Sequence, residues 1–141
     1  MSDPRFRPRD FTLEPDAFGV AVSLRWKTIP ELLAEYPEFS AKSKVIEARL
    51  GAAKLQHAYA YRIRAQMKAA GMKPATYGRA STLTQLDKAH PADQINKVLR
   101  GAIIMRLEHI AMADLILGEI SEFNRAAAAR TRAPAGQAQP R

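Results

Sequence analysis

The stretch HPADQINKVLRG, residues 90–101, has the start and stop signals of a short helix. Pro91 suits the first helical position, where no N–H is needed, and Gly101 suits a chain that leaves a helix at positive φ. Asp93 near the start, and Lys97 and Arg100 near the end, carry the charges that the helix dipole favours. The pattern therefore predicts a helix over residues 91–100.

The predicted helix has one apolar and one polar side. On a helical wheel Ile95, Val98 and Leu99 share one face, which we expect to be buried. The opposite side carries the polar residues Asp93, Gln94, Asn96, Lys97 and Arg100. Amides and cations on an exposed face are suited to hydrogen-bond base edges and to neutralise phosphates. An ordinary solvated surface helix has a similar composition, and this segment alone leaves that interpretation open.

Positive charge is concentrated around this segment. The 141 residues include 22 Lys and Arg against 14 Asp and Glu, which gives a net charge of +8. Residues 61–106 hold nine of the basic residues against only Asp87 and Asp93, whereas the rest of the chain is nearly balanced. Such an excess favours a polyanionic partner, because each neutralised phosphate releases counterions. A basic, well-solvated surface is the alternative.

Helical patterns recur along the chain. Thr28 and Glu31 have capping-box spacing at the start of TIPELLAEY, which predicts a short helix there. Apolar residues keep helical spacing over residues 40–72, where we expect Gly51 to break or bend a long helix and Gly71 to end it.

Two further segments bracket residues 90–101. MKPATYGRAST, from Met72, is rich in turn formers, and LTQLDKA after it allows one short helix. The run MRLEHIAMADLILGEI, from Met105, predicts a helix over about 105–117, and a further short helix can follow through Phe123.

Two motifs resemble the Cro/repressor-type (XRE-like) helix-turn-helix family. Its recognition helix closes on Leu or Glu, any residue, then Gly, and a helix of the form M-x-L-x-x-I-A-x-A-x-x-x-L-G follows. INKVLRG (95–101) and MRLEHIAMADLILG (105–118) match both motifs in order, and YRIRAQMKAAGM (61–72) resembles the first helix of the family. The segment between Gly71 and Gly101 is longer than in the family and leaves the second helix ambiguous.

The resemblance covers residues 55–120 and implies a lambda-repressor-like helix-turn-helix domain within an all-α fold of five or six helices. We expect a mobile basic arm at 1–15, an N-terminal helical extension at 16–51 and the helix-turn-helix domain at 52–124. The Ala-, Pro- and Gln-rich residues 125–141 lack the apolar surface that ordering requires, so we expect a disordered tail.

The function that the resemblance implies is sequence-specific binding of double-stranded DNA by a transcriptional regulator, with repression favoured and a phage-like origin in keeping with the compact chain. The candidate DNA contacts are Gln85, Lys88, His90, Asp93, Gln94, Asn96, Lys97 and Arg100. Asp93 is favoured as a helix cap over a base contact. A homodimer would match two half-sites, with residues 16–51 or 105–123 as the interface.

Two other functions stay open. The first is a helical protein–protein module, antitoxin-like or an adaptor, that holds a partner through the nearly neutral residues 16–51. The second is a DNA-packaging or nucleoid-type protein with little sequence preference. Measuring affinity for many different duplexes distinguishes this second function from a regulator. A sequence-specific protein binds its own site about 10³-fold or more tighter than other DNA.

The sequence predicts no enzyme, metal or cofactor. His57, His90 and His109 have no H-x-x-x-H or H-E-x-x-H spacing, cysteine is absent, and no phosphate-binding glycine loop or nucleophile elbow occurs. We expect the histidines to be packing or surface residues. No run approaches the roughly 20 apolar residues of a membrane span, and the start lacks a signal-peptide core. We therefore expect a cytoplasmic protein without membrane contact.

Overall fold

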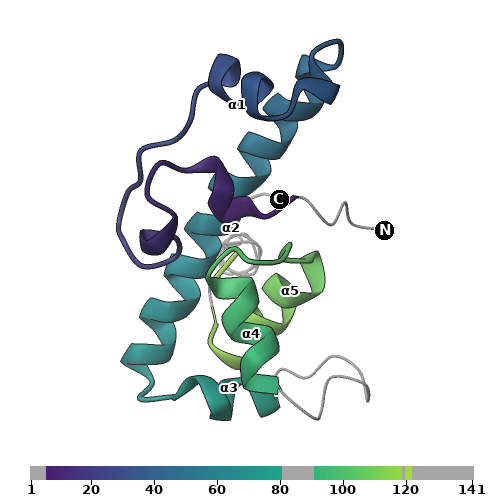
Figure 1. The fold of residues 1–141 in the computed structure, drawn as a ribbon. Coiled ribbons are helices and arrows are strands. Elements are labelled where there is room, and N and C mark those ends of the chain that lie inside the picture. The colour runs from purple at the N-terminus through teal and green to yellow at the C-terminus, as the bar shows by residue number, and fades with distance from the viewer. Residues whose placement is uncertain (1–5, 81–90, 119, 122–141) are drawn as a thin grey trace, which may run out of the picture.

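The computed structural model describes residues 6–80, 91–118 and 120–121 (Figure 1). The α-helices in these ranges are α1 (Ile29–Glu35), α2 (Ser43–Ala69), α3 (Pro74–Ala80), α4 (Pro91–Leu99) and α5 (Leu107–Ile116). Short 3₁₀ turns occur at Pro8–Phe11 (η1), Pro15–Ala17 (η2) and Pro37–Phe39 (η3). The described ranges contain no strand, and Thr12 and Trp26 form only an isolated bridge. The predicted all-α class is confirmed.

Helix α1 forms where its capping box predicts. The Thr28 hydroxyl accepts a hydrogen bond from the Glu31 backbone N–H, and the Glu31 carboxylate accepts one from the Thr28 N–H at 2.8 Å. Two N–H groups that have no partner inside the helix are thereby satisfied. Leu32 is fully buried, and the helix ends two residues before Pro37. Local chemistry alone accounts for this element.

Helix α2 is the central element, and η1, α1, η3 and α4 pack against it (Figure 1). Its 27 residues make a rod of about 40 Å. The break expected at Gly51 is wrong, because the helix continues through it and leaves open space beside it. The predicted boundary between residues 51 and 52 therefore lies inside one helix. At the far end Gly71 has a φ of 66° and ends the helix as predicted.

Two apolar cores lie along α2. The N-terminal core consists of Phe11, Leu32, Ile46 and Ala53. The C-terminal core consists of Phe18, Ala60, Ile63, Met67, Tyr77, Ile95, Leu99, Ala113 and Ile120. Trp26 packs against both cores, so the two are continuous through its ring.

Residues 6–15 differ from the mobile arm expected over 1–15. Pro8 and Phe11 are buried, and the Arg9 N–H donates to the Gly101 carbonyl at 3.1 Å. Phe11 and Thr12 also pair with the chain around Trp26. Burying an aromatic side chain stabilises this segment without any periodic pattern, which is why the sequence did not reveal it. Residues 1–5 lie outside the described part.

Helix α3 occupies part of the segment expected to be turn-rich. Pro74 stands in its first turn, where a missing N–H has no consequence, and the Tyr77 side chain is fully buried. Burial and the negative charge of Asp114 raise the pKa of Tyr77 to about 12. The short helix expected within residues 83–89 lies outside the described residues.

Helices α4 and α5 follow the predicted order. Ile95, Val98 and Leu99 are at most 4% exposed, so the predicted buried face of α4 is confirmed. Helix α5 is slightly shorter than the predicted 105–117, because the His109 ring nitrogen Nδ1 accepts the Arg106 N–H and starts the helix at Leu107. The expected continuation through Phe123 and the tail at 125–141 lie beyond the described residues.

Candidate nucleic-acid interface

The outward side of α4 is polar and basic. Lys97 and Arg100 are exposed, and Gln94 and Asn96 are partly exposed beside them. Within the described part of the chain, neither Lys97 nor Arg100 forms an ion pair with a carboxylate. The face therefore offers amides and unneutralised cations in a row on one short helix, the groups that bind base edges and phosphates.

Four of the eight predicted DNA contacts have described side chains, and all four lie on this face: Gln94, Asn96, Lys97 and Arg100. Gln85, Lys88 and His90 lie outside the described residues. The backbone of Asp93 is helical, and its side chain is not described. The role of these residues in DNA binding stays a prediction.

Gln56 holds the C-terminal end of α4 against α2. Its side chain is 5% exposed, and its Nε2 donates to the Val98 carbonyl at 2.8 Å and to the Ile103 carbonyl at 2.9 Å. Its Oε1 accepts the Met105 N–H at 2.8 Å. One amide thus joins α2 to the end of α4 and to the chain that leads into α5. These three hydrogen bonds, one buried and two part-buried, restrict movement of α4 relative to α2. A helix that binds in a DNA groove needs such a fixed orientation.

The same end of α4 is also held by the N-terminal segment. Gly19 has a φ of 76°, and a Cβ placed there would lie 2.3 Å from the Leu99 carbonyl oxygen. A Cβ on Gly101 would lie 2.8 Å from the Phe18 ring. Both positions therefore require glycine, for the backbone angle and for the close approach. Only the folded chain reveals this, because Gly19 lies in a segment without helical pattern.

His57 supports Gly19 from α2. Its Nδ1 accepts the Gly19 N–H at 2.8 Å, and its ring packs edge-on against Phe18 and Trp26. Burial lowers the pKa of His57, and the nearby backbone of Ala21 offsets part of this effect. The folded state therefore favours the neutral form of the His57 imidazole. The expectation that His57 and His109 are packing residues is confirmed, whereas His90 is outside the described residues.

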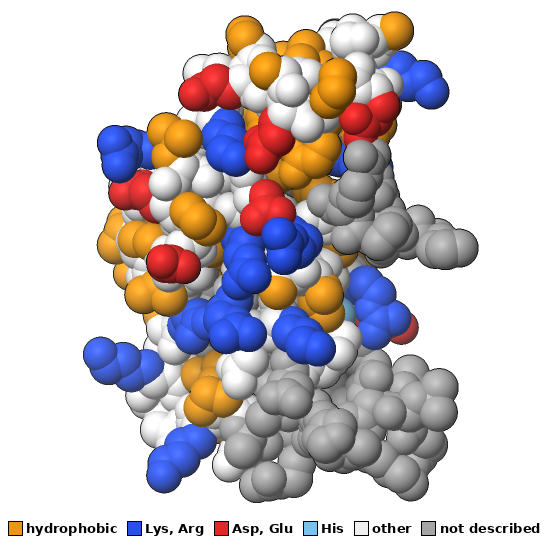
Figure 2. Space-filling view, viewed as in Figure 1, with side chains coloured by type: hydrophobic (Ala, Val, Ile, Leu, Met, Phe, Trp, Pro, Cys, Tyr) orange, Lys and Arg blue, Asp and Glu red, His pale blue; other side chains and the backbone are white. Residues whose placement is uncertain are grey.

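Arg64 is a candidate that sequence reasoning missed. It extends the buried stripe of His57 and Ala60 by one helical turn, and its Nε lies 3.4 Å from the ideal Cβ position of Gly19. The Nε is shielded from solvent and has no hydrogen-bond partner in the described structure. Burial, and then the positive charge of Arg100, lower the pKa of Arg64. In Figure 2, Lys and Arg side chains gather across the middle of the molecule, where η1 meets the end of α4.

Arg62 provides a contrast on the same helix. Its Nη1 donates to the Ile120 carbonyl at 3.0 Å, and its guanidinium lies over the Tyr59 ring. Arg62 thus stabilises the chain that follows α5. Arg62 and Arg64 therefore have different surroundings: Arg62 contacts a carbonyl and a ring, whereas the Arg64 Nε is buried without a described hydrogen-bond partner.

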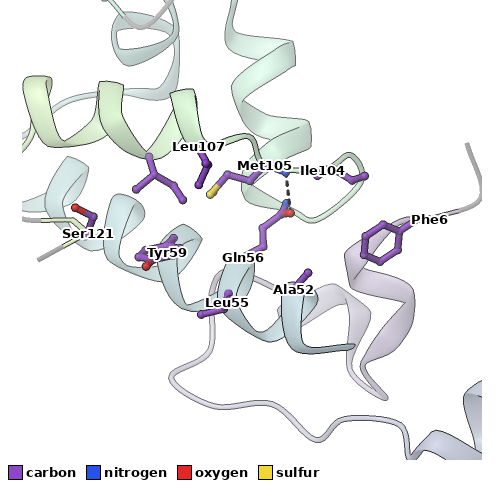
Figure 3. Close-up of a pocket in the computed structure, with 10 residues that line it drawn as sticks. Phe6, Ala52, Leu55, Gln56, Tyr59, Ile104, Met105, Leu107 and Ser121 are labelled. Carbon is purple, nitrogen blue, oxygen red and sulfur yellow. Dashed lines mark hydrogen bonds between the residues drawn. The ribbon is translucent and has the colours of Figure 1, made fainter. Parts of the chain in front are cut away.

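A second candidate surface is an apolar groove between α2 and the start of α5 (Figure 3). Its volume is about 380 Å³, and its lining includes Leu55, Tyr59, Met105, Leu107 and Ile110. Leu55 is 60% exposed and Leu107 84%, and Leu115, two turns along α5, is 79% exposed. The polar atoms of Gln56 at its floor are already hydrogen-bonded, so the groove suits apolar groups.

No group of three or more His, Cys, Asp or Glu side chains in the described ranges is placed to hold a metal ion. No helix in these ranges is long and apolar enough to cross a membrane.

Comparison with known proteins found no matching protein-family model, no similar curated protein and no similar solved structure.

Proposed function

We propose that this chain binds double-stranded DNA through the exposed face of α4. One observation carries the proposal: α4 presents Asn96, Lys97 and Arg100 without a described carboxylate beside them, and its opposite face is fully buried. Cations that have no internal partner attract phosphates, and amides beside them can read bases.

The proposed arrangement is a helix-turn-helix. The C-terminal part of α2 would be its first helix, α3 its second and α4 its recognition helix, in keeping with the family resemblance of residues 55–120. Helix α3 packs closely on α4, which supports its assignment as the second helix. On this basis the protein is a sequence-specific transcriptional regulator, with repression as the favoured mode.

The test is selection from a random double-stranded library at two salt concentrations. The wild type should retain and enrich a palindrome, and the double variant Lys97→Ala/Arg100→Ala should lose retention. The matched control is Lys44→Ala/Lys54→Ala, which removes two exposed charges from α2 and should bind as the wild type does. Retention without enrichment would favour the packaging or nucleoid function. No retention at low salt would exclude DNA binding.

The proposal includes self-association through the apolar groove. Leu107 protrudes beside the groove that it helps to line, so two copies related by a twofold axis can each insert apolar side chains into the other. A dimer would present two α4 helices to two half-sites.

Sedimentation tests this interface. Leu107→Ser/Leu115→Ser should shift a wild-type dimer to monomer, whereas Leu13→Ser, at an exposed leucine outside the groove, should leave the dimer intact. A monomeric wild type at concentrations well above those needed for DNA binding would exclude this interface. The partner surface predicted over residues 16–51 stays a prediction, and its most exposed apolar side chain is Val22.

A further inference from the structure

The Arg64 side chain on α2 lies near the end of α4, the point at which Arg100 follows. Arg64 lies on α2, and Arg100 follows the last residue of α4. The Arg64 Nε and the Leu99 carbonyl oxygen both lie within contact distance of the same ideal Cβ position on Gly19. The charge of Arg100 is close enough to act on Arg64. The absence of a side chain at Gly19 is what lets these groups approach.

No acidic group in the described structure offsets this pair. The described ion pairs join Arg7 to Asp10, Arg25 to Glu14, Lys27 to Glu35 and Arg106 to Glu108. Neither Arg64 nor Arg100 takes part in them. The positive charge of Arg100 repels that of Arg64, and the repulsion is weakly screened because Arg64 is part-buried. An anion beside the two arginines would relieve this repulsion.

The chemistry of the pair favours a phosphate group. Guanidinium presents a planar fork of donors that matches phosphate oxygens, whereas lysine offers only a point charge. Lys97, in the last turn of α4, adds a third cation on the exposed side. We propose that Arg64 and Arg100 together bind one phosphate group, and that in the DNA complex this group is a backbone phosphodiester beside the C-terminal end of α4. The choice of DNA as its source rests on the proposed function.

The assignment makes Arg64 a residue that fixes the position of α4 on the duplex. Phosphate contacts set register and orientation, and base contacts then specify sequence. Arg64 is anchored on α2, which Gln56 joins to α4, so a phosphate held there would fix the distance between the backbone and the recognition face. Its loss should weaken binding to all sequences alike.

The first arm of the test measures duplex binding against salt. Arg64→Gln should reduce the slope of log affinity against log salt by about 0.9, the value for one phosphate contact. Lys54→Gln, which removes an exposed cation from the N-terminal half of the same helix, should leave the slope unchanged. An unchanged slope for Arg64→Gln, with the wild type binding DNA, would overturn the phosphate site and leave the proposed function standing.

The second arm uses inorganic pyrophosphate without DNA. Pyrophosphate should shift the Arg64 Nε–H signal in nuclear magnetic resonance spectra and, by binding the folded state, should raise the melting temperature of the wild type. Arg64→Gln should abolish this rise. Pyrophosphate binding without any DNA binding would overturn the DNA source and identify a small phosphate ligand. No shift of the Arg64 signal by either pyrophosphate or DNA would overturn the site altogether.

Folding of the variant separates binding from a structural role. In anion-free buffer Arg64→Gln should melt at or above the wild-type temperature, because it removes a part-buried cation that repels Arg100. A lower melting temperature would mean that Arg64 stabilises the fold, and would count against the proposal.

Discussion

The two halves of α2 differ in how they use charge. Around the N-terminal core, three cations are paired or stacked: Arg7 contacts Asp10 at 2.9 Å, Lys27 contacts Glu35 at 3.0 Å, and Arg49 lies over the Phe6 and Phe39 rings. Around the C-terminal core, Arg64, Lys97 and Arg100 have no such described partners. Charges that fold a protein are compensated internally, whereas uncompensated ones are available to a ligand.

The two halves also differ in their internal supports. The N-terminal half depends on a local capping box and apolar packing. The C-terminal half adds buried polar groups, Gln56 and His57, which connect segments far apart in sequence. Substitutions in the C-terminal half should therefore affect both stability and DNA binding, and those in the N-terminal half should affect stability alone.

The largest effect is expected from Gly19→Ala. The new Cβ would collide with the Leu99 carbonyl in a left-handed backbone conformation, which should cost about 2–5 kcal/mol of unfolding free energy from overpacking and strain. Gly51→Ala is the matched control: it lies in a helix with open space around it and should stabilise by about 0.5–1 kcal/mol. Urea denaturation measures both. Equal effects at the two glycines would show that residues 16–26 do not support α4.

Gln56→Leu should have the next largest effect. It leaves the Val98 carbonyl, the Ile103 carbonyl and the Met105 N–H without this partner, and should lower the unfolding free energy by about 2–4 kcal/mol. DNA affinity should fall further than in Gln66→Leu, a less buried amide of the same helix. Wild-type DNA affinity in a folded Gln56→Leu protein would contradict the positioning of α4 by this residue.

His57 should make stability depend on pH. Because burial lowers its pKa in the folded state, the unfolded chain binds the proton more tightly. Its contribution is complete above the ordinary imidazole pKa of about 6.5 and is lost as pH falls below that value. Denaturation from pH 8 to pH 5 should show this loss, and His57→Gln, whose amide oxygen can accept the Gly19 N–H, should reduce it. The same slope in both proteins would assign the effect to other groups.

The smallest effect is expected in the N-terminal half. Thr28→Ala removes the helix cap and should lower stability by about 1 kcal/mol. DNA affinity should not change, because α1 makes no contact with the face of α4 that is proposed to bind. The hydrogen bonds from Thr28 lower the pKa of Glu31. The stability that the ionised Glu31 carboxylate contributes is therefore lost as pH falls below the ordinary Glu pKa of about 4.3. Thr76→Ala, an exposed position in α3, is the control for threonine loss.

Much of the fold was predictable because its signals are local. Thr28 and Glu31 predicted α1, Pro91 and Gly101 bounded α4, and the apolar spacing of Ile95, Val98 and Leu99 gave its buried face. The error at Gly51 has a physical cause: a glycine lowers helix propensity only modestly, and packing along a long helix outweighs that loss. The tyrosine of α3 could not be recognised from a segment whose composition is typical of turns.

The candidate site likewise has a part that local sequence signals predict and a part that they do not. The sequence by itself determined which residues α4 exposes, because helical periodicity and end signals act within a dozen residues. Only the tertiary structure brings residues 6–19 into contact with the end of α4. It also places Arg64 of α2 near the same end of that helix. These contacts join segments that share no sequence pattern. They arise because Phe11 and Phe18 are buried, with the Phe18 ring packed on the His57 ring of α2. Burial of whole side chains, which no local motif encodes, set the geometry of the charges.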